Sequence, residues 1–409
     1  FIFMAWFQGV VLLIVGTSSV FSAAARERQG GTLDFHRVSP TSAANIIVGL
    51  LVGSPFLEWS ITLLVVPFAA GFALAAGVGW LLILYFYASL ILCAVLFHTL
   101  ALLGGLTLNP QRIQEGYSSW LLGIVVLLGL ASIAGLAFGV SSLYHATCLP
   151  AFISIVVPPT VEIFQETRFA SLSRFLYLDL PPLLMQAIVQ VPLLALALIA
   201  AVRTVARPER PILSKPQLLF GTGFLFFLFV GGGVSCTLVT EAAHGFLTVL
   251  ALERVFLLFT VALGLAGTAL ATPNALDYCR GMRKARKEGF QDATSFDDRA
   301  SHVGWLAGFA ALAFITYVAL LCLTTPVGPV LFAVALLIAL CQIACFSGAL
   351  EWFRLRKHCR RAGLFAILVA ILWILTPAFG MILTIPGVAE HALVFNSSFP
   401  FLFGPPMVL

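Results

Sequence analysis

The chain has 409 residues, of which 61% are hydrophobic and only 10% are charged, and its mean hydropathy is +1.06. About a quarter of the residues of a soluble globular domain are charged. The composition therefore excludes that class and predicts an all-α, polytopic membrane helix bundle whose surroundings are the lipid bilayer. The net charge of +5 indicates no nucleic-acid partner, because the basic residues lie beside apolar runs.

Ten apolar runs approach or exceed the length of about 20 residues that a membrane-spanning helix needs. The first run already begins at Phe1, so we expect the sequence to be N-terminally incomplete, and we place the end of this first span near Ala25. A tight hairpin at Gly77 to Gly79 separates the second span from the third. The predicted spans are residues 1–22, 57–76, 79–106, 119–145, 182–202, 218–237, 254–271, 303–323, 328–349 and 363–384.

The basic residues indicate how these spans are oriented. If the loop at residues 23–45 lies in the cytoplasm and the spans alternate, 19 of the 22 Lys and Arg residues fall on the cytoplasmic side. This distribution follows the positive-inside rule. We therefore expect a multi-pass protein of a bacterial cytoplasmic membrane. The basic stretches at 279–289 and 354–361 fit the same reading as anchors beside the spans.

The spans divide into two predicted domains. Residues 1–202 form the first helix bundle, and residues 203–409 form a second bundle of about five spans. The seam lies near "RTVARPERPILSKP" at 203–216, which is rich in Pro and Arg. The largest outer segment is 146–181, where "VEIFQETRFASLSRFLYL" has apolar residues near helical spacing and predicts an amphipathic helix at the outer surface.

The segment at residues 26–51 is polar and well specified for a loop. Gly30 and Gly31 are expected to end the first helix, because glycine permits a sharp turn and weakens a helix. A short helix follows, with Asp34 in its first turn. Ser39 then reads as an N-cap with Pro40 at the first helical position. The helix that this cap starts is predicted to be amphipathic, to lie along the inner surface through Ile46, Ile47, Leu50 and Leu51, and to end near Ser54 and Pro55.

The stretch "RERQGGTLDFHRVSPTSAANIIVGLLVGSP" resembles a loop of type 2 exporter permeases of the ATP-binding-cassette (ABC) transporters. The residues that match in order are Glu27, Gly31, Thr32, Leu33, Asp34, Ser39, Pro40, Ile47 and Gly49. Two departures are an additional glycine at Gly30 and Leu50 at a position that is often basic in that family. The resemblance covers about residues 5–110, and no motif extends it beyond them.

The resemblance implies that this segment is a coupling helix with its flanks, which docks on an ATPase subunit. It implies a permease subunit that exports a substrate while a separate chain hydrolyses ATP. The chain itself has no phosphate-binding Gly-x4-Gly-Lys-Ser/Thr loop, so we expect no enzyme activity and no cofactor in it. A second permease copy or homologue is a further expected partner. The implied coupling residues are Glu27, Gly31, Thr32, Leu33, Asp34, Arg37, Ser39 and Pro40.

Two alternative functions stay open. One is a membrane-embedded enzyme with an outer-face site around His145, Glu162, Glu166, Glu241 and His244. The other is a membrane anchor subunit that does not transport. No metal motif is present, and a metal at paired residues such as Glu241 and His244 would need further ligands from elsewhere. Glu58 opens the second span, where a helix N-terminus favours a negative charge.

Overall fold

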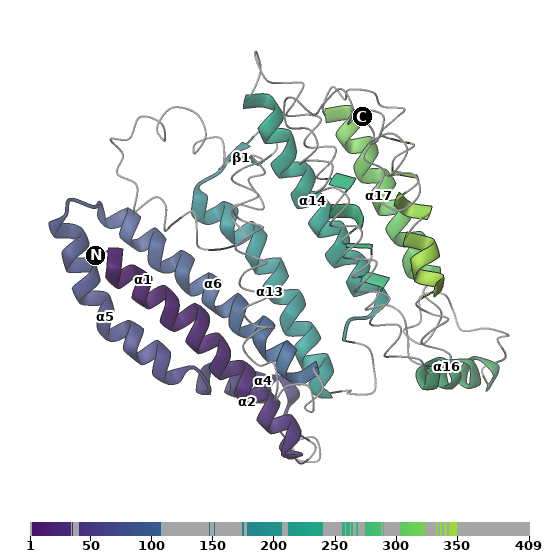
Figure 1. The fold of residues 1–409 in the computed structure, drawn as a ribbon, viewed down its shortest axis with the longest axis horizontal. Helices are drawn as coiled ribbons and strands as arrows, with labels where there is room; N and C mark the ends of the chain where they lie inside the picture. The colour runs from purple at the N-terminus through teal and green to yellow at the C-terminus, as the bar shows by residue number, and fades with distance from the viewer. Residues whose placement is uncertain are drawn as a thin grey trace, which may run out of the picture. The chain divides into compact units, whose positions relative to one another are not determined.

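The computed structural model describes residues 2–33, 35, 41–107, 147, 151, 174–175, 178–206, 212–239 and 303–323, with shorter stretches inside 256–289 and 333–349. The fold of these residues is helical apart from one short strand pair (Figure 1). In chain order the elements are α1 (Ile2–Val10), the π-helix η1 (Val11–Gly16), α2 (Thr17–Gln29), α4 (Ala43–Gly53), α5 (Phe56–Ala75), α6 (Trp80–Thr107), β1 (Arg174–Phe175), β2 (Leu178–Asp179), α13 (Pro182–Ala206), α14 (Lys215–Val239), α16 (Ala275–Lys287) and α17 (Val303–Leu323).

Six helices in the described residues are long and apolar enough to cross a membrane, and each coincides with a predicted span. They are Ile2–Gln29, Phe56–Ala75, Trp80–Thr107, Pro182–Ala206, Lys215–Gly232 and Val303–Leu323. The predicted spans 119–145 and 363–384 lie outside the described residues, and 254–271 and 328–349 are described only in part. The protein is therefore a helical membrane protein, and the count of about ten spans stays a prediction.

The first helix is longer than predicted. It runs without a break through α1, η1 and α2 to Gln29, rather than ending near Ala25. At 1.5 Å per residue its 28 residues extend about 42 Å, beyond a hydrocarbon core of about 30 Å. The last turn remains helical because Arg, Glu and Gln are good helix formers and because Arg26 and Arg28 lie where the helix C-terminus favours positive charge.

The turn between α5 and α6 is the tight hairpin that was predicted. Gly77 has a φ of 81°, in the left-handed region that favours glycine, and its N–H donates to the carbonyl of Leu74 at 3.0 Å. Helix α6 begins at Trp80, directly after this turn. The two long helices are therefore antiparallel neighbours in the chain.

The polar segment after α2 agrees with the prediction in part. Gly30 caps the helix, and Gly31 has a φ of 72°, so the glycine pair ends α2 as expected. The predicted start of the next helix at Ser39 and Pro40 is wrong, because α4 begins at Ala43. Its N-cap is Ser42, whose hydroxyl accepts from the N–H of Asn45 at 3.2 Å. The predicted end of this helix is confirmed, since α4 stops at Gly53 and Ser54 is its C-cap.

The outer segment departs from the predicted amphipathic helix at its end. Residues 174–175 and 178–179 form an antiparallel strand pair in which Arg174 lies opposite Asp179 and Phe175 lies opposite Leu178. Phe175 is buried, and its ring packs directly on Gly231, which has no Cβ to block it. The remainder of the predicted helix lies outside the described residues. This tertiary contact explains why helical spacing misled the prediction here.

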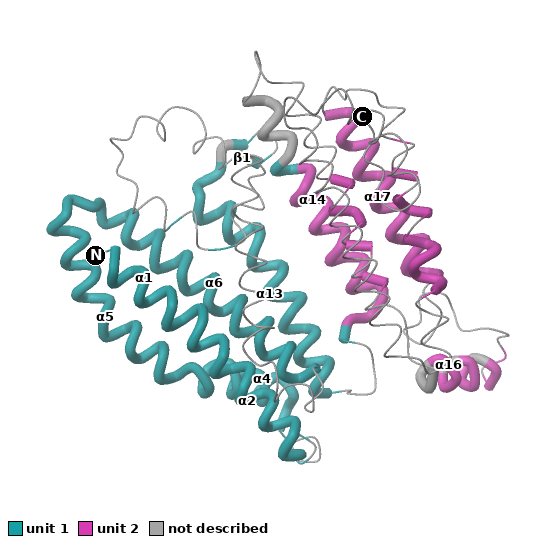
Figure 2. Tube along the Cα trace, in the orientation of Figure 1, with its two compact units in different colours: residues 1–212, 231–239 teal, residues 213–230, 240–409 magenta. Residues whose placement is uncertain are grey.

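The chain divides into two compact units (Figure 2). Unit 1 comprises residues 1–212 and 231–239, and unit 2 comprises residues 213–230 and 240–409. The division into two functional domains, at residues 1–202 and 203–409, stays a prediction. Helix α16 in unit 2 has the exposed basic side chains Arg280, Arg283, Lys284, Arg286 and Lys287, as a basic anchor beside a membrane would.

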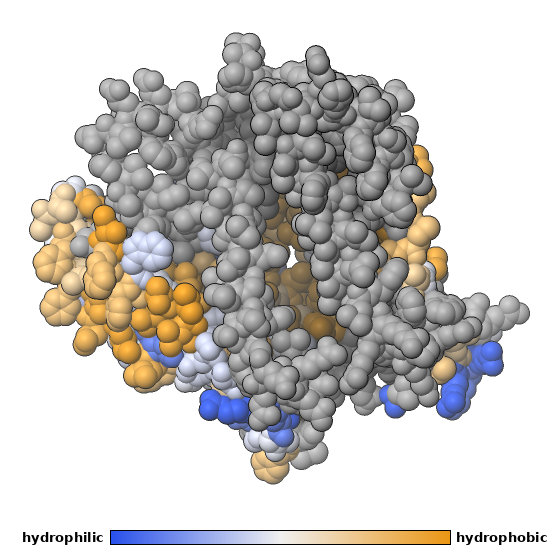
Figure 3. Space-filling model, viewed as in Figure 1, coloured by the Kyte–Doolittle hydropathy of each residue, from blue (hydrophilic) through white to orange (hydrophobic). Residues whose placement is uncertain are grey.

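Large apolar side chains cover much of the surface of unit 1. In Figure 3 this apolar surface lies over the helices labelled α1 and α5 in Figure 1. It includes Phe3, Trp6, Leu64 and Phe68, each more than half exposed. A patch of this extent is unusual for a protein surrounded by water. Lipid contact explains it, since acyl chains are as apolar as these side chains.

Candidate functional site

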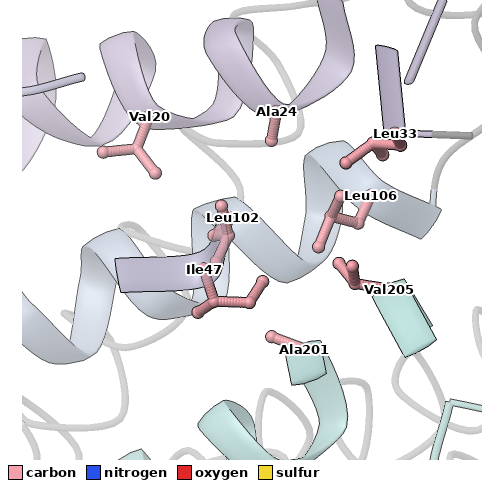
Figure 4. Packing of buried hydrophobic residues seen from close by; sticks show 8 residues of the cluster. All are labelled: Val20, Ala24, Leu33, Ile47, Leu102, Leu106, Ala201 and Val205. Atoms are coloured by element: carbon pink, nitrogen blue, oxygen red, sulfur yellow. The ribbon is translucent and has the colours of Figure 1, made fainter. Parts of the chain in front are cut away.

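Two places in unit 1 combine informative residues with a defined geometry. The first is the base of the polar segment, where Leu33 and Ile47 are both buried. Figure 4 shows their side chains converging with those of three long helices. The cluster consists of Val20 and Ala24 from α2, Leu33, Ile47 from α4, Leu102 and Leu106 from α6, and Ala201 and Val205 from α13. We refer to these eight residues as the basal cluster.

The basal cluster attaches the short helix α4 to the long helices α2, α6 and α13. Ile46, Leu50 and Leu51 pack against it from the same helix. The structure agrees with the prediction that Ile46, Ile47, Leu50 and Leu51 share one apolar face of this helix. Its predicted amphipathic character is wrong, because Val48 and Val52 on the other side are 57% and 61% exposed. Apolar side chains on both sides of a helix are typical of a lipid or protein environment rather than of water.

The predicted coupling residues differ in their surroundings. Gly31 and Thr32 are exposed, whereas Leu33 is buried in the basal cluster. Glu27 is half-buried, and its Oε2 atom is buried without a hydrogen-bond partner in the described part of the chain. The remaining four, Asp34, Arg37, Ser39 and Pro40, lie outside the described residues. Of the four coupling residues that the structure describes, Leu33 is the one that packs in the basal cluster.

The second place is a group of buried polar side chains between the first three long helices. Gln8 of α1 is fully buried and connects two neighbours. Its Nε2 donates to the carbonyl of Thr62 on α5 at 3.2 Å, and its Oε1 accepts from the hydroxyl of Tyr87 on α6 at 3.2 Å. Hydrogen bonds between membrane helices typically contribute about 1 kcal/mol each. Gln8 therefore ties three helices together.

Glu58 lies in the first turn of α5 and is only 6% exposed. Its Oε1 accepts a hydrogen bond from the hydroxyl of Ser19 on α2 at 2.8 Å. Its Oε2 is buried and has no hydrogen-bond partner among the described residues. An ionisable side chain buried in a membrane bundle is costly and is by default a candidate for function.

His98 of α6 is 2% exposed and lies against the π-helix. Its Nε2 donates to the carbonyl of Leu12 at 3.0 Å. Short π-helical turns are rare and occur frequently at functional sites. A Cβ at Gly16 would lie 2.9 Å from this Nε2, so only glycine leaves room for the ring there. The indole of Trp59 packs edge-on against the imidazole with a centroid separation of 6.0 Å.

A further polar contact joins α6 to α13. Gln186 is fully buried, and its Nε2 donates to the carbonyl of Ser89 at 3.3 Å. The Oε1 of Gln186 and the hydroxyl of Ser89 have no hydrogen-bond partner among the described residues. Unit 1 therefore carries buried polar atoms on α1, α5, α6 and α13.

The sequence indicates Glu58 only as a residue at a helix N-terminus, and Gln8 and His98 do not stand out in it. One sequence feature could have indicated a functional role for them: each of the three is a polar or ionisable residue within or at the edge of an apolar run. The sequence does not indicate that they meet. The alternative outer-face residues, His145, Glu162, Glu166, Glu241 and His244, lie outside the described residues. No cluster of three potential metal ligands occurs in the described part of the chain.

Comparison with known proteins identifies no relative: no protein-family model, curated protein or solved structure matches this chain.

Proposed function

We propose that the protein is the transmembrane permease subunit of an ABC exporter of the type 2 class in a bacterial cytoplasmic membrane. In this proposal it moves its substrate outward while a separate ATPase subunit hydrolyses ATP. The sequence around residues 26–51 is the origin of the proposal, and about ten spans would complete the bundle. Because the sequence of the apolar spans contains few acids or arginines that could form a charged ring, apolar or amphipathic cargo is favoured over ions.

The observation that carries the proposal is the basal cluster. A coupling element must transmit motion from a soluble motor to helices in lipid, and a loosely attached loop would not transmit it. Leu33 and Ile47 both belong to the segment at residues 26–51, and they share one apolar core with α2, α6 and α13. A displacement of this segment would therefore act on three long helices together, because packed side chains resist independent movement.

A fourth helix, α5, is connected to the coupling segment directly through the backbone. Only Ser54 and Pro55 separate the end of α4 from the start of α5. Closure of a pair of ATPase subunits against residues 26–51 would thus reach α5 through the backbone. Glu27 and Asp34 would face or orient the motor, together with Arg37. The exposed apolar residues Val48 and Val52 suit the membrane boundary beside it.

The proposal is tested by co-expressing the complete gene with the ATPase encoded nearest to it and purifying the complex in detergent. We expect the wild type to retain the ATPase. A variant with Gly31→Pro and Asp34→Lys should lose it while remaining folded in the membrane. Gly77→Ala is the matched control, because it strains another left-handed glycine at the opposite end of α5. Failure of the wild type to retain any ATPase, or equal retention by the double variant, contradicts docking through this segment.

A second pair of variants separates a permease from a passive anchor. Ile47→Ala removes a buried side chain of the basal cluster, whereas Val48→Ala removes an exposed neighbour on the same helix. We expect Ile47→Ala to keep the ATPase bound but to abolish any change in its ATP hydrolysis rate caused by the membrane subunit. Val48→Ala should behave as the wild type. If the wild type itself leaves the hydrolysis rate unchanged, the anchor alternative is supported.

A further inference from the structure

We propose that helix α16 (Ala275–Lys287) is a binding surface for anionic phospholipids, which lies in the plane of the membrane surface with one side toward the acyl chains. The partner is a lipid such as phosphatidylglycerol, whose phosphate the basic side of the helix recognises. This role goes beyond a general attraction between basic residues and a membrane, because two sides of one helix make different contacts. It is independent of the exporter function proposed above.

Helix α16 is too short to cross a membrane. Its 13 residues extend about 20 Å at 1.5 Å per residue, whereas the hydrocarbon core is about 30 Å thick. The helix also has a defined end: Gly289 has a φ of 84°, and its N–H donates to the carbonyl of Arg286 at 3.2 Å. The next long helix that the structure describes, α17, begins at Val303 and is a candidate membrane span. In the chain, α16 is therefore a separate short helix that precedes a span.

The exposed side of α16 is strongly basic. Its sequence contains five basic residues and one acidic residue, Asp277. The five basic side chains are all exposed: Arg280, Arg283, Lys284, Arg286 and Lys287. In Figure 3 hydrophilic side chains lie over the helix labelled α16 in Figure 1. A cluster of about four to eight Lys and Arg residues on an amphipathic helix is typical of a site for anionic lipids. Arginine in particular can donate two hydrogen bonds to one phosphate.

The opposite side of α16 carries larger apolar side chains that are less exposed. Tyr278 and Met282 are one turn apart, and both are half-buried. With 3.6 residues per turn, these two share one side of the helix, while Arg280, Lys284 and Lys287 lie on the other. A short helix with a basic side and an apolar side is typical of the boundary between head groups and acyl chains. Tyrosine is also enriched at this depth of a membrane.

A position in the membrane surface suits both sides of α16 together. The apolar side would contact the acyl chains, and the basic side would then lie at the level of the phosphates. Arg286 lies nearer to the apolar side, and its long side chain can extend from there to the head groups. Figure 1 shows α16 running at a large angle to α17, which belongs to the same compact unit. Such a direction is expected of a surface helix beside a helix that crosses the membrane.

The test is native mass spectrometry of the purified full chain in an uncharged detergent, with phosphatidylglycerol or phosphatidylcholine added. We expect the wild type to bind phosphatidylglycerol in preference to phosphatidylcholine. Arg283→Gln with Lys284→Gln should weaken phosphatidylglycerol binding about 25-fold, since each basic residue near an anionic surface contributes about fivefold. Binding of phosphatidylcholine, whose head group has no net charge, should not change.

A matched variant separates a two-sided helix from general charge attraction. Tyr278→Arg with Arg280→Tyr keeps the composition and the net charge but exchanges a residue of the apolar side with one of the basic side. We expect this variant to lose at least fivefold in affinity for phosphatidylglycerol. Equal affinity in the wild type and this variant would overturn the proposal, because charge alone would then account for binding. Circular dichroism verifies that each variant remains helical, and if this exchange disrupts folding, the glutamine variant decides.

Three further results would contradict this role of α16. The first is a wild type that binds both lipids equally, and the second is a glutamine variant that binds phosphatidylglycerol as the wild type does. The third is competition by inorganic phosphate, which would indicate a site for the free anion. Release of a co-expressed ATPase by the glutamine variant, with lipid binding unchanged, would instead make α16 a protein-docking surface. The lipid measurement contains neither ATPase nor cargo, so its failure is distinguishable from failure of the exporter function.

Discussion

The two units differ in how their described buried polar groups are satisfied. In unit 1 the side chains of Gln8, Ser19 and His98 form hydrogen bonds with residues of other helices. In unit 2 the buried hydroxyls of Thr222, Thr268 and Thr316, and that of Ser347, bond to carbonyls of their own helices. A hydrogen bond of this kind satisfies the hydroxyl within its own helix and does not itself join two helices. Polar groups therefore join helices in unit 1, whereas the described residues of unit 2 show a different interaction between their helices.

That other interaction is aromatic packing. Phe226 lies between Phe256 and Phe309 at centroid distances of 6.0 and 5.9 Å, and Trp305 packs on Phe309 at 5.4 Å. Phe229 stacks on Phe259 at 5.4 Å. Association of helices in lipid depends on close packing and on polar contacts, since burial of apolar surface gives little there. The comparison teaches that the described helices of unit 2 meet through close aromatic packing, and that those of unit 1 also meet through polar contacts.

The largest expected effect comes from breaking the aromatic packing of unit 2. Phe309→Ala should lower the free energy of unfolding by about 3 kcal/mol, toward the low end for phenylalanine truncation, because lipid replaces part of the lost apolar contact. Phe314→Ala, which removes an exposed ring from the same helix α17, is the control and should cost far less. Titration of the purified protein with sodium dodecyl sulfate in mixed micelles measures both. Equal effects of the two variants would show that the ring cluster is not what stabilises unit 2.

An intermediate effect is expected from the hydrogen bond between helices in unit 1. Ser19→Ala removes the donor to Glu58 and leaves that carboxyl oxygen buried, so unfolding should become easier by about 1 to 2 kcal/mol. Ser60→Ala removes a hydroxyl that bonds only to its own helix at Phe56 and should be close to neutral. The same detergent titration compares them. An effect of Ser60→Ala as large as that of Ser19→Ala would remove the distinction between the two kinds of bond.

The smallest effect is expected in unit 2 at Thr316. Its hydroxyl bonds to the carbonyl of Leu312 within α17 at 2.8 Å. Thr316→Val keeps the shape of the side chain, and the helix carbonyl retains its backbone partner, so the change in unfolding free energy should be within about 0.5 kcal/mol. Thermal unfolding followed by circular dichroism checks this. A loss comparable to that of Ser19→Ala would mean that unit 2 also depends on polar contacts.

Local features were predicted from the sequence with good success. Six spans, the hairpin at Gly77 and the break at Gly31 follow from runs of apolar residues and from the freedom of glycine, and neighbours along the chain suffice to specify them. The errors also have local causes. The first helix continued past Ala25 because its charged residues are good helix formers, and Ser42 rather than Ser39 became the N-cap of α4.

The tertiary structure alone decided which buried residues meet. Helical periodicity identifies the buried face of a helix when the opposite face is polar. Here the sides that face lipid and the sides that face protein are both apolar, so periodicity does not tell them apart. The sequence by itself therefore determined that the chain is a bundle of membrane helices and where six of them run. Only packing placed Leu33 beside Ile47, Gln8 between Thr62 and Tyr87, and His98 against the π-helix. These contacts join residues far apart in the chain, and no local sequence pattern predicts that they meet.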